Sequence, residues 1–289
     1  MIVLATNTTK RIAFLTGSSS GFGLHTSVAL AKAGFFVIAT MRDISKREEL
    51  DKLAAQNGVT DCLEVVQMDV TRPDEVIAAV SGVLARHQNI DLLVNNAGFA
   101  CGGFVEEIGL AAWREQFEVN VFGLICVTQA VLPHMRERQY GTIINISSIS
   151  GRIGFPGLAA YAASKHAVEG FSESLRLEML PHGINVVLVE PGSYKTSIWE
   201  KGLGNAPSRP ASPYSRQMES LTTMVTKIAE RAPAPDEVVE VIVRAALAPR
   251  PSFRYPVGSG VRLSILAKQW LPWRWFETLV NKQMRPPRS

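Results

Sequence analysis

Tyr161 and Lys165 are the two residues whose types and spacing point to acid–base chemistry. They stand four apart in Tyr161-Ala-Ala-Ser-Lys165, and the apolar residues around them predict a helix from Ala159 to Pro181. Side chains four apart on a helix share a face. A free tyrosine titrates at about pH 10, and a neighbouring ammonium lowers that pKa by stabilising the phenolate. The pair predicts a general acid or base, although the same spacing arises by chance on many helices.

A glycine-rich turn near the start of the chain predicts a phosphate site. The apolar run Arg11–Thr16 ends in Gly17-Ser-Ser-Ser-Gly-Phe-Gly23, and a helical pattern follows up to Gly34. A strand, turn and helix of this kind lets the backbone approach a pyrophosphate at the helix N-terminus. The spacing G-x-x-x-G-x-G differs from the common dinucleotide fingerprint, and glycines also occur in ordinary strand–helix turns. Three glycines directly after the first strand favour nucleotide binding.

The end of the second predicted strand bears on the choice of nucleotide. Phe35–Thr40 is followed by Met41-Arg42-Asp43. An arginine here accommodates a ribose 2′-phosphate, whereas a carboxylate accepts from a 2′-hydroxyl. Arg42, with a hydroxyl from Ser19 or Ser20, favours NADP. The alternative is that Asp43 binds the ribose and Arg42 is solvated.

Strands alternate with helical segments along most of the chain. Further strands are predicted at 63–68, 91–95, 141–147 and 184–190, with a short edge strand at 252–256. This alternation predicts an α/β fold with a doubly wound parallel sheet, in which ligands bind at the carboxyl ends of the strands. Several polar and glycine-bearing stretches are expected to meet at that edge: 17–23, Arg42, Asp69 with Val70, 95–98, Ser148 and 191–196.

With these residues assembled, the chain resembles the short-chain dehydrogenase/reductase family over about residues 10–258. The motifs are Thr16–Gly23, Asp69, Asn95-Asn-Ala-Gly98, Asn120, Ser148, Tyr161–Lys165 and Pro191-Gly-Ser-Tyr-Lys-Thr196. Ala39–Asp43 looks like the NADP-preferring hydroxysteroid and retinol dehydrogenase branch. The resemblance implies a single Rossmann-like domain of about seven strands, over residues 1–258, that transfers hydride with NADP(H).

The resemblance also assigns roles to residues. The catalytic set falls on Asn120, Ser148, Tyr161 and Lys165, and Ser148 is preferred to Ser147 because it lies 13 residues before Tyr161. Asn120 is expected to kink its helix and anchor a water joined to Lys165. The cofactor-binding residues implied are Gly17, Ser19, Ser20, Gly21, Phe22, Gly23, Arg42, Asp69, Val70, Asn95, Ala97, Gly98, Tyr161, Lys165, Pro191, Gly192 and Thr196.

Composition and charge exclude several other classes. Hydrophobic residues make up 46% of the chain and charged residues 19%, enough to bury a sizeable core. The net charge of +4 divides into +5 for residues 262–289 and −1 for the rest, so the main body has no nucleic-acid surface. Cys62, Cys101 and Cys126 have no disulfide or zinc spacing, which fits a reducing, cytoplasmic setting. No metal site, signal peptide or spanning helix is expected.

The loops around the expected site are apolar and carry no evident acid or base. The residues are Phe99, Phe104, Ile149, Ile153, Phe155, Leu158, Tyr194, Ile198 and Trp199. Such a pocket suits a bulky, hydrophobic alcohol, ketone or aldehyde. Residues 193–235 are interpreted as a substrate lid, the alternative being a loose surface excursion.

The C-terminal extension, residues 259–289, is the part least typical of the family. Apolar residues recur at helical steps from Val261 to Met284, interrupted by Pro272. Tryptophans among basic residues over 262–284 are compatible with peripheral contact with a membrane. Packing over the substrate cleft or against a second subunit is the favoured alternative. The resemblance implies a homodimer or homotetramer.

Three functions remain to be separated. Hydride transfer between a hydrophobic carbonyl and its alcohol is the leading interpretation. Epimerisation or dehydration on the same fold would need a further acid or base in the pocket. A nucleotide-sensing or scaffold protein is the non-enzyme alternative, against which Tyr161 and Lys165 both argue.

Overall fold

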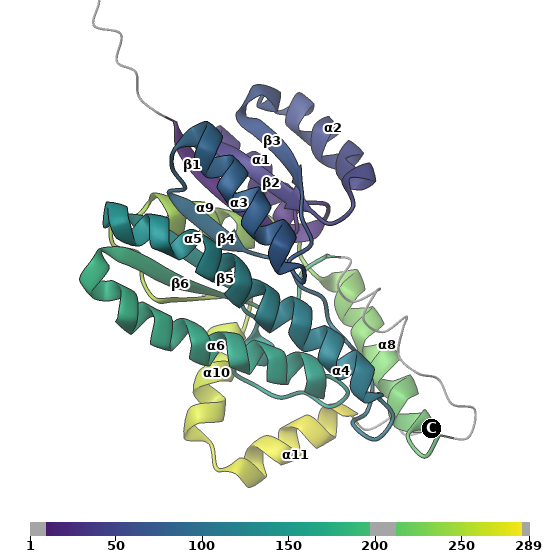
Figure 1. The fold of residues 1–289 in the computed structure, drawn as a ribbon. Coiled ribbons are helices and arrows are strands. Elements are labelled where there is room, and N and C mark those ends of the chain that lie inside the picture. Colours follow the sequence, from purple (N-terminus) through teal and green to yellow (C-terminus); the bar gives the residue numbers. More distant parts are fainter. Residues whose placement is uncertain (1–9, 197–211, 285–289) are drawn as a thin grey trace, which may run out of the picture.

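The fold is a single sheet of seven parallel strands covered by helices on both faces (Figure 1). The computed structural model describes residues 10–196 and 212–284. The strand order is β3-β2-β1-β4-β5-β6-β7, and every neighbouring pair is parallel. The strands are β1 (Arg11–Thr16), β2 (Phe35–Met41), β3 (Leu63–Gln67), β4 (Leu92–Asn95), β5 (Gly141–Ile146), β6 (Ile184–Pro191) and β7 (Arg254–Val257). The predicted doubly wound sheet of about seven strands is confirmed.

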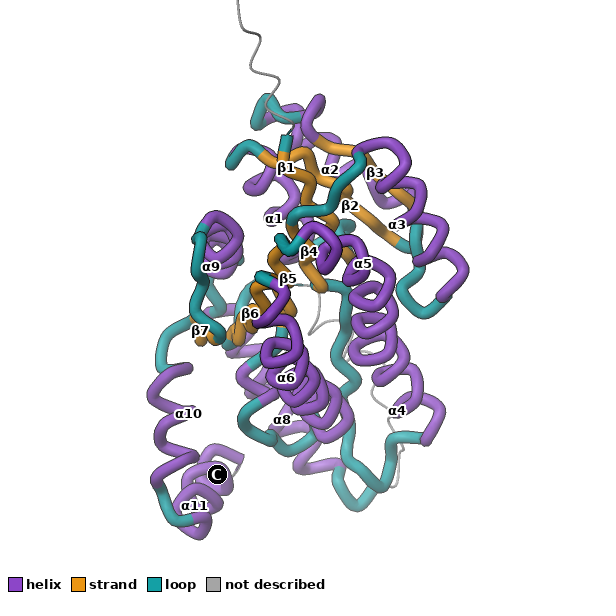
Figure 2. The backbone as a smooth tube through the Cα atoms, turned by 60° about the vertical axis from the view of Figure 1, so that its left-hand side comes forward, coloured by secondary structure: helices purple, strands orange, loops and turns teal. Residues whose placement is uncertain are grey.

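Two helical layers enclose the sheet. Helices α1 (Gly21–Lys32) and α9 (Asp236–Leu247) pack together on one face, with α2 (Glu48–Gln56) beside α1. Helices α3 (Pro73–His87), α5 (Leu124–Arg138) and α6 (Ala159–Met179) lie on the other face (Figures 1 and 2). Helix α2 was not predicted. It is short, and only Leu50 and Ala54 are buried, so few buried positions mark it in the sequence.

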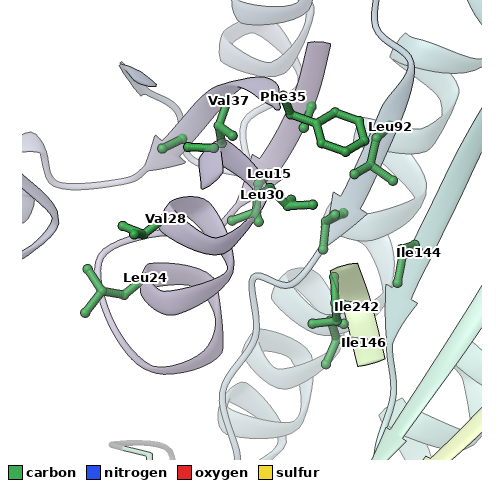
Figure 3. Packing of buried hydrophobic residues seen from close by; sticks show 14 of the residues in the cluster. Leu15, Leu24, Val28, Leu30, Phe35, Val37, Leu92, Ile144, Ile146 and Ile242 are labelled. Atoms are coloured by element: carbon green, nitrogen blue, oxygen red, sulfur yellow. The ribbon is translucent and has the colours of Figure 1, made fainter. Parts of the chain in front are cut away.

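The core between sheet and helices is made of aliphatic side chains from consecutive strands. Leu15, Val37 and Ile144 from three strands meet Leu30 of α1 and Ile242 of α9 in one cluster (Figure 3). Both faces of the central strands are covered, so these strands are buried at nearly every position rather than at alternate ones. Each such side chain contributes about 1.5–3 kcal/mol when fully buried. The core thereby fixes the carboxyl edge of the sheet.

The predicted helical region 110–138 contains a local change of helix type. It comprises α4 (Leu110–Phe117), a π-helical turn (Glu118–Gly123) and α5. The wider turn is centred on Asn120, where the sequence predicted a kink. π-helical turns interrupt the regular backbone hydrogen bonds and often occur at functional sites.

The same region has the length and apolar composition of a membrane span. Among the described residues, Leu110–Arg138 is the one helical stretch long and apolar enough to cross a membrane. Its most apolar window has a mean hydropathy of 1.2, and 39% of that window is buried. The expectation of no such helix rested on the absence of an unbroken apolar run. Because α5 packs on α3, β4 and β5, we interpret the stretch as a core helix of the fold.

Helices α8 (Ser215–Arg231), α10 (Val261–Trp270) and α11 (Trp273–Met284) shape the end of the molecule beyond the sheet. Helix α8 lies in the predicted lid, while α10 and α11 form the C-terminal extension. The predicted break at Pro272 is confirmed, since α10 and α11 end and begin on either side of it. Helix α10 contacts β7, and α11 contacts α8 (Figures 1 and 2).

Candidate active site

Three elements bring the four candidate catalytic residues together. Ser148 follows the carboxyl end of β5, Tyr161 and Lys165 lie on the first turns of α6, and Asn120 lies in the π-helical turn. All four are buried. The Lys165 ammonium lies 5.8 Å from the centroid of the Tyr161 ring, so the predicted shared helix face holds.

The Tyr161 hydroxyl is hydrogen-bonded to the Ser148 side chain. Burial raises the pKa of Tyr161 to about 12, and the bond to Ser148 offsets only part of that rise. The sequence argument expected the opposite direction, with Lys165 lowering the pKa. Desolvation outweighs the ammonium here because the phenol is enclosed by the protein. At neutral pH Tyr161 is therefore a protonated acid.

The Lys165 ammonium donates to the Ile146 carbonyl oxygen at 2.8 Å. Burial lowers the pKa of Lys165 to about 8, and the negative charge of Glu169, one helical turn on, opposes that fall. The side chain thus holds and releases a proton within the range of pH where enzymes work. The hydrogen bond to the Ile146 carbonyl, at the end of β5, fixes the orientation of the Lys165 side chain.

Asn120 connects the π-helical turn to the loop after β4. Its Oδ1 accepts from the Phe99 amide at 3.0 Å, and its Nδ2 donates to the Phe99 carbonyl at 3.0 Å and to the Ser164 hydroxyl at 3.1 Å. Asn120 therefore ties that loop to helix α6. The predicted water between Asn120 and Lys165 stays a prediction.

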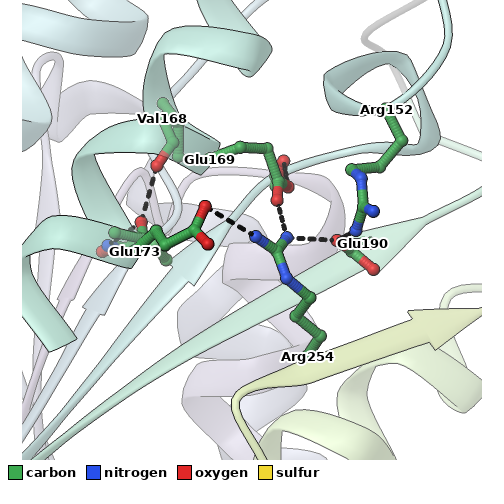
Figure 4. Close-up of polar contacts among 9 residues, drawn as sticks. Arg152, Val168, Glu169, Glu173, Glu190 and Arg254 are labelled. Carbon is green, nitrogen blue, oxygen red and sulfur yellow. Dashed lines mark hydrogen bonds and ion pairs between the residues drawn. The ribbon is translucent and has the colours of Figure 1, made fainter. Parts of the chain in front are cut away.

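An ion-pair cluster around the buried Glu169 and Glu190 begins one helical turn beyond Lys165 (Figure 4). Arg254 of β7 pairs with Glu169 and, at 2.8 Å, with Glu190 of β6, and Arg152 lies 3.0 Å from the same Glu190 oxygen. The Ser147 hydroxyl donates to Glu169. Burial and the charge of Glu190 raise the pKa of Glu169. Ser147 is thus engaged in this cluster, whereas Ser148 meets Tyr161.

A cavity of about 520 Å³ opens over the carboxyl ends of the strands. It includes the point between β1 and β4 where the strand order reverses, which is where α/β sheets bind ligands. Predicted residues in its wall are Gly17, Ser19, Ser20, Gly21, Phe22, Arg42, Asp69, Val70, Ala97, Gly98, Ser148, Tyr161, Lys165, Pro191, Gly192 and Thr196. Asn120 supports the wall from behind.

The sequence and the fold match known proteins. The model of the short chain dehydrogenase family matches residues 11–204. An uncharacterized oxidoreductase YusZ of Bacillus subtilis is 47% identical over 278 residues, covering 95% of this chain and 99% of that protein. Human 17-beta-hydroxysteroid dehydrogenase type 1 is 35% identical, covering 85% and 77%. A short-chain dehydrogenase structure from Streptomyces avermitilis has a TM-score of 0.79 at 33% identity, covering 94% and 96%.

This chain belongs to the short-chain dehydrogenase/reductase family. It is therefore an oxidoreductase acting on CH–OH groups, with a nicotinamide cofactor as the family's hydride carrier.

The glycine turn of this dehydrogenase fits a dinucleotide. Gly17 and Gly21 have φ of +72° and +56°, and a Cβ on Gly17 would lie 2.8 Å from the Ala97 Cα. The turn delivers the N-terminus of α1 to the cavity wall, and the first turn of α1 carries no acidic residue. Backbone amides and the helix dipole there favour a phosphate group.

Two predicted cofactor residues lie away from the cavity. Asn95 is buried in the interior, where its Nδ2 donates to Thr128 and Asn145. Gly23 serves packing, because a Cβ on it would lie 2.1 Å from the Gly17 carbonyl oxygen. Strand alternation turns Asn95 inward, and helix phase turns Gly23 inward. Asn95 and Gly23 do not line the cavity, and their part in cofactor binding stays a prediction.

The neighbour of Asn95 takes the place in the cavity wall. Asn96 lines the cavity, and its Nδ2 donates to the Thr16 and Gly17 carbonyls at 2.9 and 3.0 Å. It thereby joins the end of β4 to the glycine turn. Because β4 ends at Asn95, the alternation of strand side chains could have indicated that Asn96, and not Asn95, lines the cavity.

Charges near the end of β2 are unevenly engaged. Arg42, Asp43 and Lys46 all line the cavity. The Asp43 carboxylate already accepts from the backbone and hydroxyl of Ser45 and lies 3.4 Å from the Lys46 ammonium. These bonds lower the pKa of Asp43, the Ser45 hydroxyl contributing most. The cavity edge at this point is therefore cationic overall.

The apolar loops divide into wall and interior. Phe99 lines the cavity, and Phe104 stacks on Tyr214 before α8, with ring centroids 4.7 Å apart. Tyr194 is more buried than a rim residue: its hydroxyl donates to Glu237 of α9, and its ring touches Phe22. Ile198 and Trp199 lie outside the described residues. Of the other predicted rim residues, Ile153 and Leu158 are buried, and Ile149 and Phe155 are partly buried.

Three ionisable residues in the cavity wall were missed, namely Lys46 after β2 and two residues near the loop after β4. Cys101 and Glu115 both line it, although the sequence argument expected no acid or base there. Burial and the charge of Glu115 raise the pKa of the Cys101 thiol. Glu115 is solvent-exposed on α4, so it belongs to the outer rim of the cavity. Helical phase within α4, unknown from sequence alone, decides this placement.

Proposed function

We propose that this protein is an NADP(H)-dependent dehydrogenase/reductase that interconverts a hydrophobic ketone or aldehyde and its alcohol, with Tyr161 as general acid and base. The observation that carries the proposal is the Tyr161 hydroxyl in the cavity wall. It bonds to Ser148 and shares a helix face with Lys165.

Each side chain has a defined task in this mechanism. In reduction, Tyr161 donates its proton to the substrate oxygen. Ser148 donates to the same oxygen as negative charge grows on it. Lys165 supplies a proton to the phenolate that is left, and Asn120 holds the Phe99 loop against α6. The bound nicotinamide supplies the hydride in reduction and accepts it in oxidation.

The two reaction directions depend on pH in opposite ways. Reduction needs the phenol, which is present throughout the neutral range because the pKa of Tyr161 is about 12 in the cofactor-free protein. Oxidation needs the phenolate, so its rate rises as the pH rises. The proton held by Lys165, with a pKa of about 8, limits reduction at alkaline pH.

The preference for NADP(H) rests on Arg42. Its guanidinium lies at the cavity edge after β2, and Lys46 adds a second positive charge. Asp43, the competing ribose acceptor, is occupied by Ser45 and Lys46. A 2′-phosphate would meet two cations here, and a charged hydrogen bond contributes about 1.5–3 kcal/mol.

The apolar cavity wall supports a hydrophobic substrate. Phe99, Ala100 and Val119 line the cavity, and Leu221 of α8 is buried against Gly157. The similarity to a hydroxysteroid dehydrogenase supports the same class of substrate. Helix α8 would act as the lid, since Tyr214 before it bonds to Glu106 at 2.7 Å and closes over the loop after β4.

The test is nicotinamide absorbance with NADPH and NADH in parallel, against steroid, retinoid, aryl and small charged carbonyls. We expect turnover with NADPH on hydrophobic carbonyls. Tyr161→Phe should lower kcat/KM by about 10²- to 10⁴-fold, while Tyr140→Phe, an exposed tyrosine far from the cavity, should not. Arg42→Ala should weaken NADPH use by about 10- to 100-fold relative to NADH, with Lys52→Ala as the control.

Three results would overturn the proposal. Full activity of Tyr161→Phe would remove the assigned acid, and turnover of small charged keto acids alone would defeat the substrate class. Tight NADPH binding without turnover of any carbonyl would favour the nucleotide-sensing alternative.

A further inference from the structure

Helix α10 carries large apolar residues on two sides, one that packs on the protein and one that faces away from it. Val261 and Ile265 are 3% and 8% exposed and pack inward, and Lys268 of the same face donates to the Arg152 carbonyl. Leu263, Leu266 and Trp270, which recur at steps of three and four, are 72%, 49% and 82% exposed. A helix that packs only inward would place polar residues there. The outer stripe has no partner within the described chain.

Helix α11 continues the exposed surface around the bend at Pro272. Trp273 and Trp275 are 59% and 64% exposed. Phe276 of the same helix is only partly exposed, and its ring lies 5.4 Å from that of Trp273. Three tryptophans, all within positions 270–275, thus face solvent on two consecutive helices.

The concentration of these residues sets the segment apart. Fourteen large hydrophobic residues are exposed in the described part of the chain, and five of them lie between Leu263 and Trp275. Scattered exposed leucines are ordinary, whereas a contiguous apolar patch marks an interaction surface. Tryptophan in particular favours the boundary between water and hydrocarbon, because its ring is apolar and its N–H is polar.

Charge decides which partner fits. Residues 262–289 carry six basic residues and one acid, a net charge of +5, against −1 for the rest of the chain. A symmetric contact between two copies would bring two +5 segments together, which disfavours a second copy as the occupant. An anionic surface has the complementary charge. The exposed Arg262 and Arg274 flank the apolar residues, as they do on helices that lie in a lipid headgroup layer.

We propose that α10 and α11 dock this protein on an anionic phospholipid bilayer. Leu263, Leu266 and the three tryptophans enter the headgroup boundary, and the basic residues contact lipid phosphates. Since α11 contacts α8, the bilayer would lie beside the proposed lid helix. If the proposed hydrophobic substrate is correct, docking also gives that substrate a short path from the membrane. The binding itself does not depend on that function.

The experiment is co-sedimentation of the full-length protein with two kinds of vesicle. One is pure phosphatidylcholine, and the other is an equimolar mixture with phosphatidylglycerol. We expect strong binding to the mixed vesicles only, weakened by salt, with a blue shift of tryptophan fluorescence. Arg262→Gln with Arg274→Gln should weaken binding about 30-fold, at about tenfold in equilibrium constant per 1.4 kcal/mol and about 1 kcal/mol per basic residue.

Matched variants separate docking from other effects. Trp270→Ser with Trp273→Ser should weaken binding, while Leu177→Ser, at a residue of α6 that is also 70% exposed, should leave it unchanged. Cofactor binding should be equal in all variants. Equal binding to both vesicle types, no binding to either, or no effect of the tryptophan changes would overturn the proposal. A concentration-dependent oligomer abolished by Trp270→Ser, without vesicle binding, would assign the patch to a second copy instead.

Discussion

The catalytic centre and the C-terminal helices depart from the usual distribution of polarity in opposite directions. In the centre, Lys165, Asn120 and Glu169 are charged or polar and buried. On α10, Leu263 and Trp270 are apolar and exposed. Burying a polar group and exposing an apolar one both raise the free energy of the folded state, and neither is needed to pack the fold. We interpret buried polar residues and clustered exposed apolar residues as marks of the surfaces that meet a ligand.

The two regions differ in how the unfavourable term is offset. In the centre the offset is internal: Lys165 has the Ile146 carbonyl, and Glu169 has Arg254 and Ser147. On α10 no described residue covers the outer stripe, and the proposed lipid surface would supply the offset. Changes in the centre should therefore alter folding and catalysis strongly, and changes in the stripe should alter neither.

The largest effect is expected from Arg254→Met, which leaves Glu169 and Glu190 buried without their shared cation. Removing one partner of a buried ion pair costs about 3–5 kcal/mol. Because burial already raises the pKa of Glu169, the carboxylate left without Arg254 takes up a proton as the pH falls. A carboxyl group whose pKa is higher in the folded than in the unfolded state stabilises the fold less as the pH rises. The loss of stability in Arg254→Met should therefore be larger at pH 8 than at pH 5. Denaturant unfolding at both pH values measures it.

A second variant keeps that prediction open to contradiction. Adding Glu169→Gln to Arg254→Met removes the uncompensated charge, because Glu190 keeps Arg152 as a partner, and should recover part of the stability. If the single and double variants unfold alike at both pH values, the cluster contributes through packing and not through charge.

Next in size is the contrast between Ser148 and Ser147. Ser148→Ala removes the hydroxyl that meets Tyr161 and should lower kcat by about 10²- to 10³-fold. The same hydroxyl accepts from the Ser150 amide at 3.1 Å, so the variant should also lose about 0.5–1.5 kcal/mol of stability. Ser147→Ala leaves Glu169 without one donor and should lower stability by about 1–3 kcal/mol, with kcat within a few-fold. Kinetics and thermal unfolding of both variants measure the pair. A reversed pattern would move the catalytic serine to Ser147.

Lys165→Met should make the cofactor-free protein more stable while abolishing turnover. Burial lowers the pKa of Lys165 to about 8, so its charge in the folded state is unfavourable at neutral pH by on the order of 2 kcal/mol. Between pH 8 and 10.5 the folded state releases this proton before the unfolded state does. The wild type therefore gains stability over that range, and the gap between the two proteins narrows. Unfolding at pH 7 and pH 10 checks the sign; an unstable variant would mean that the bond to Ile146 dominates.

The sheet and the catalytic set could be predicted because both have local signals. Apolar runs marked every strand, and the spacing of Ser148, Tyr161 and Lys165 is set within one strand–loop–helix unit. Asn120 belonged to that set by resemblance, and the π-helical turn around it agrees with the predicted kink.

The remaining features depend on pairings that no local pattern contains. Arg254 meets Glu169 and Glu190 across 85 and 64 positions of the chain, so the cluster appears only when β6, β7 and α6 are assembled. The choice between Asn95 and Asn96 depended on where β4 ends. The pKa of Tyr161 depended on burial, which two residues on a helix cannot reveal.

The smallest effect is expected on the outer face of α10, where two neighbouring positions give a direct test of the comparison. Leu263→Gln changes an exposed residue to one of similar helix propensity and should alter stability by less than about 0.5 kcal/mol. Ile265→Val removes one buried methylene on the inner face and should cost about 0.5–1.5 kcal/mol. On vesicles the order reverses, since Leu263→Gln weakens binding and Ile265→Val does not. Chemical unfolding and co-sedimentation of the same two proteins measure both orders, and a loss of more than about 1 kcal/mol in Leu263→Gln would mean that protein, not lipid, covers this face.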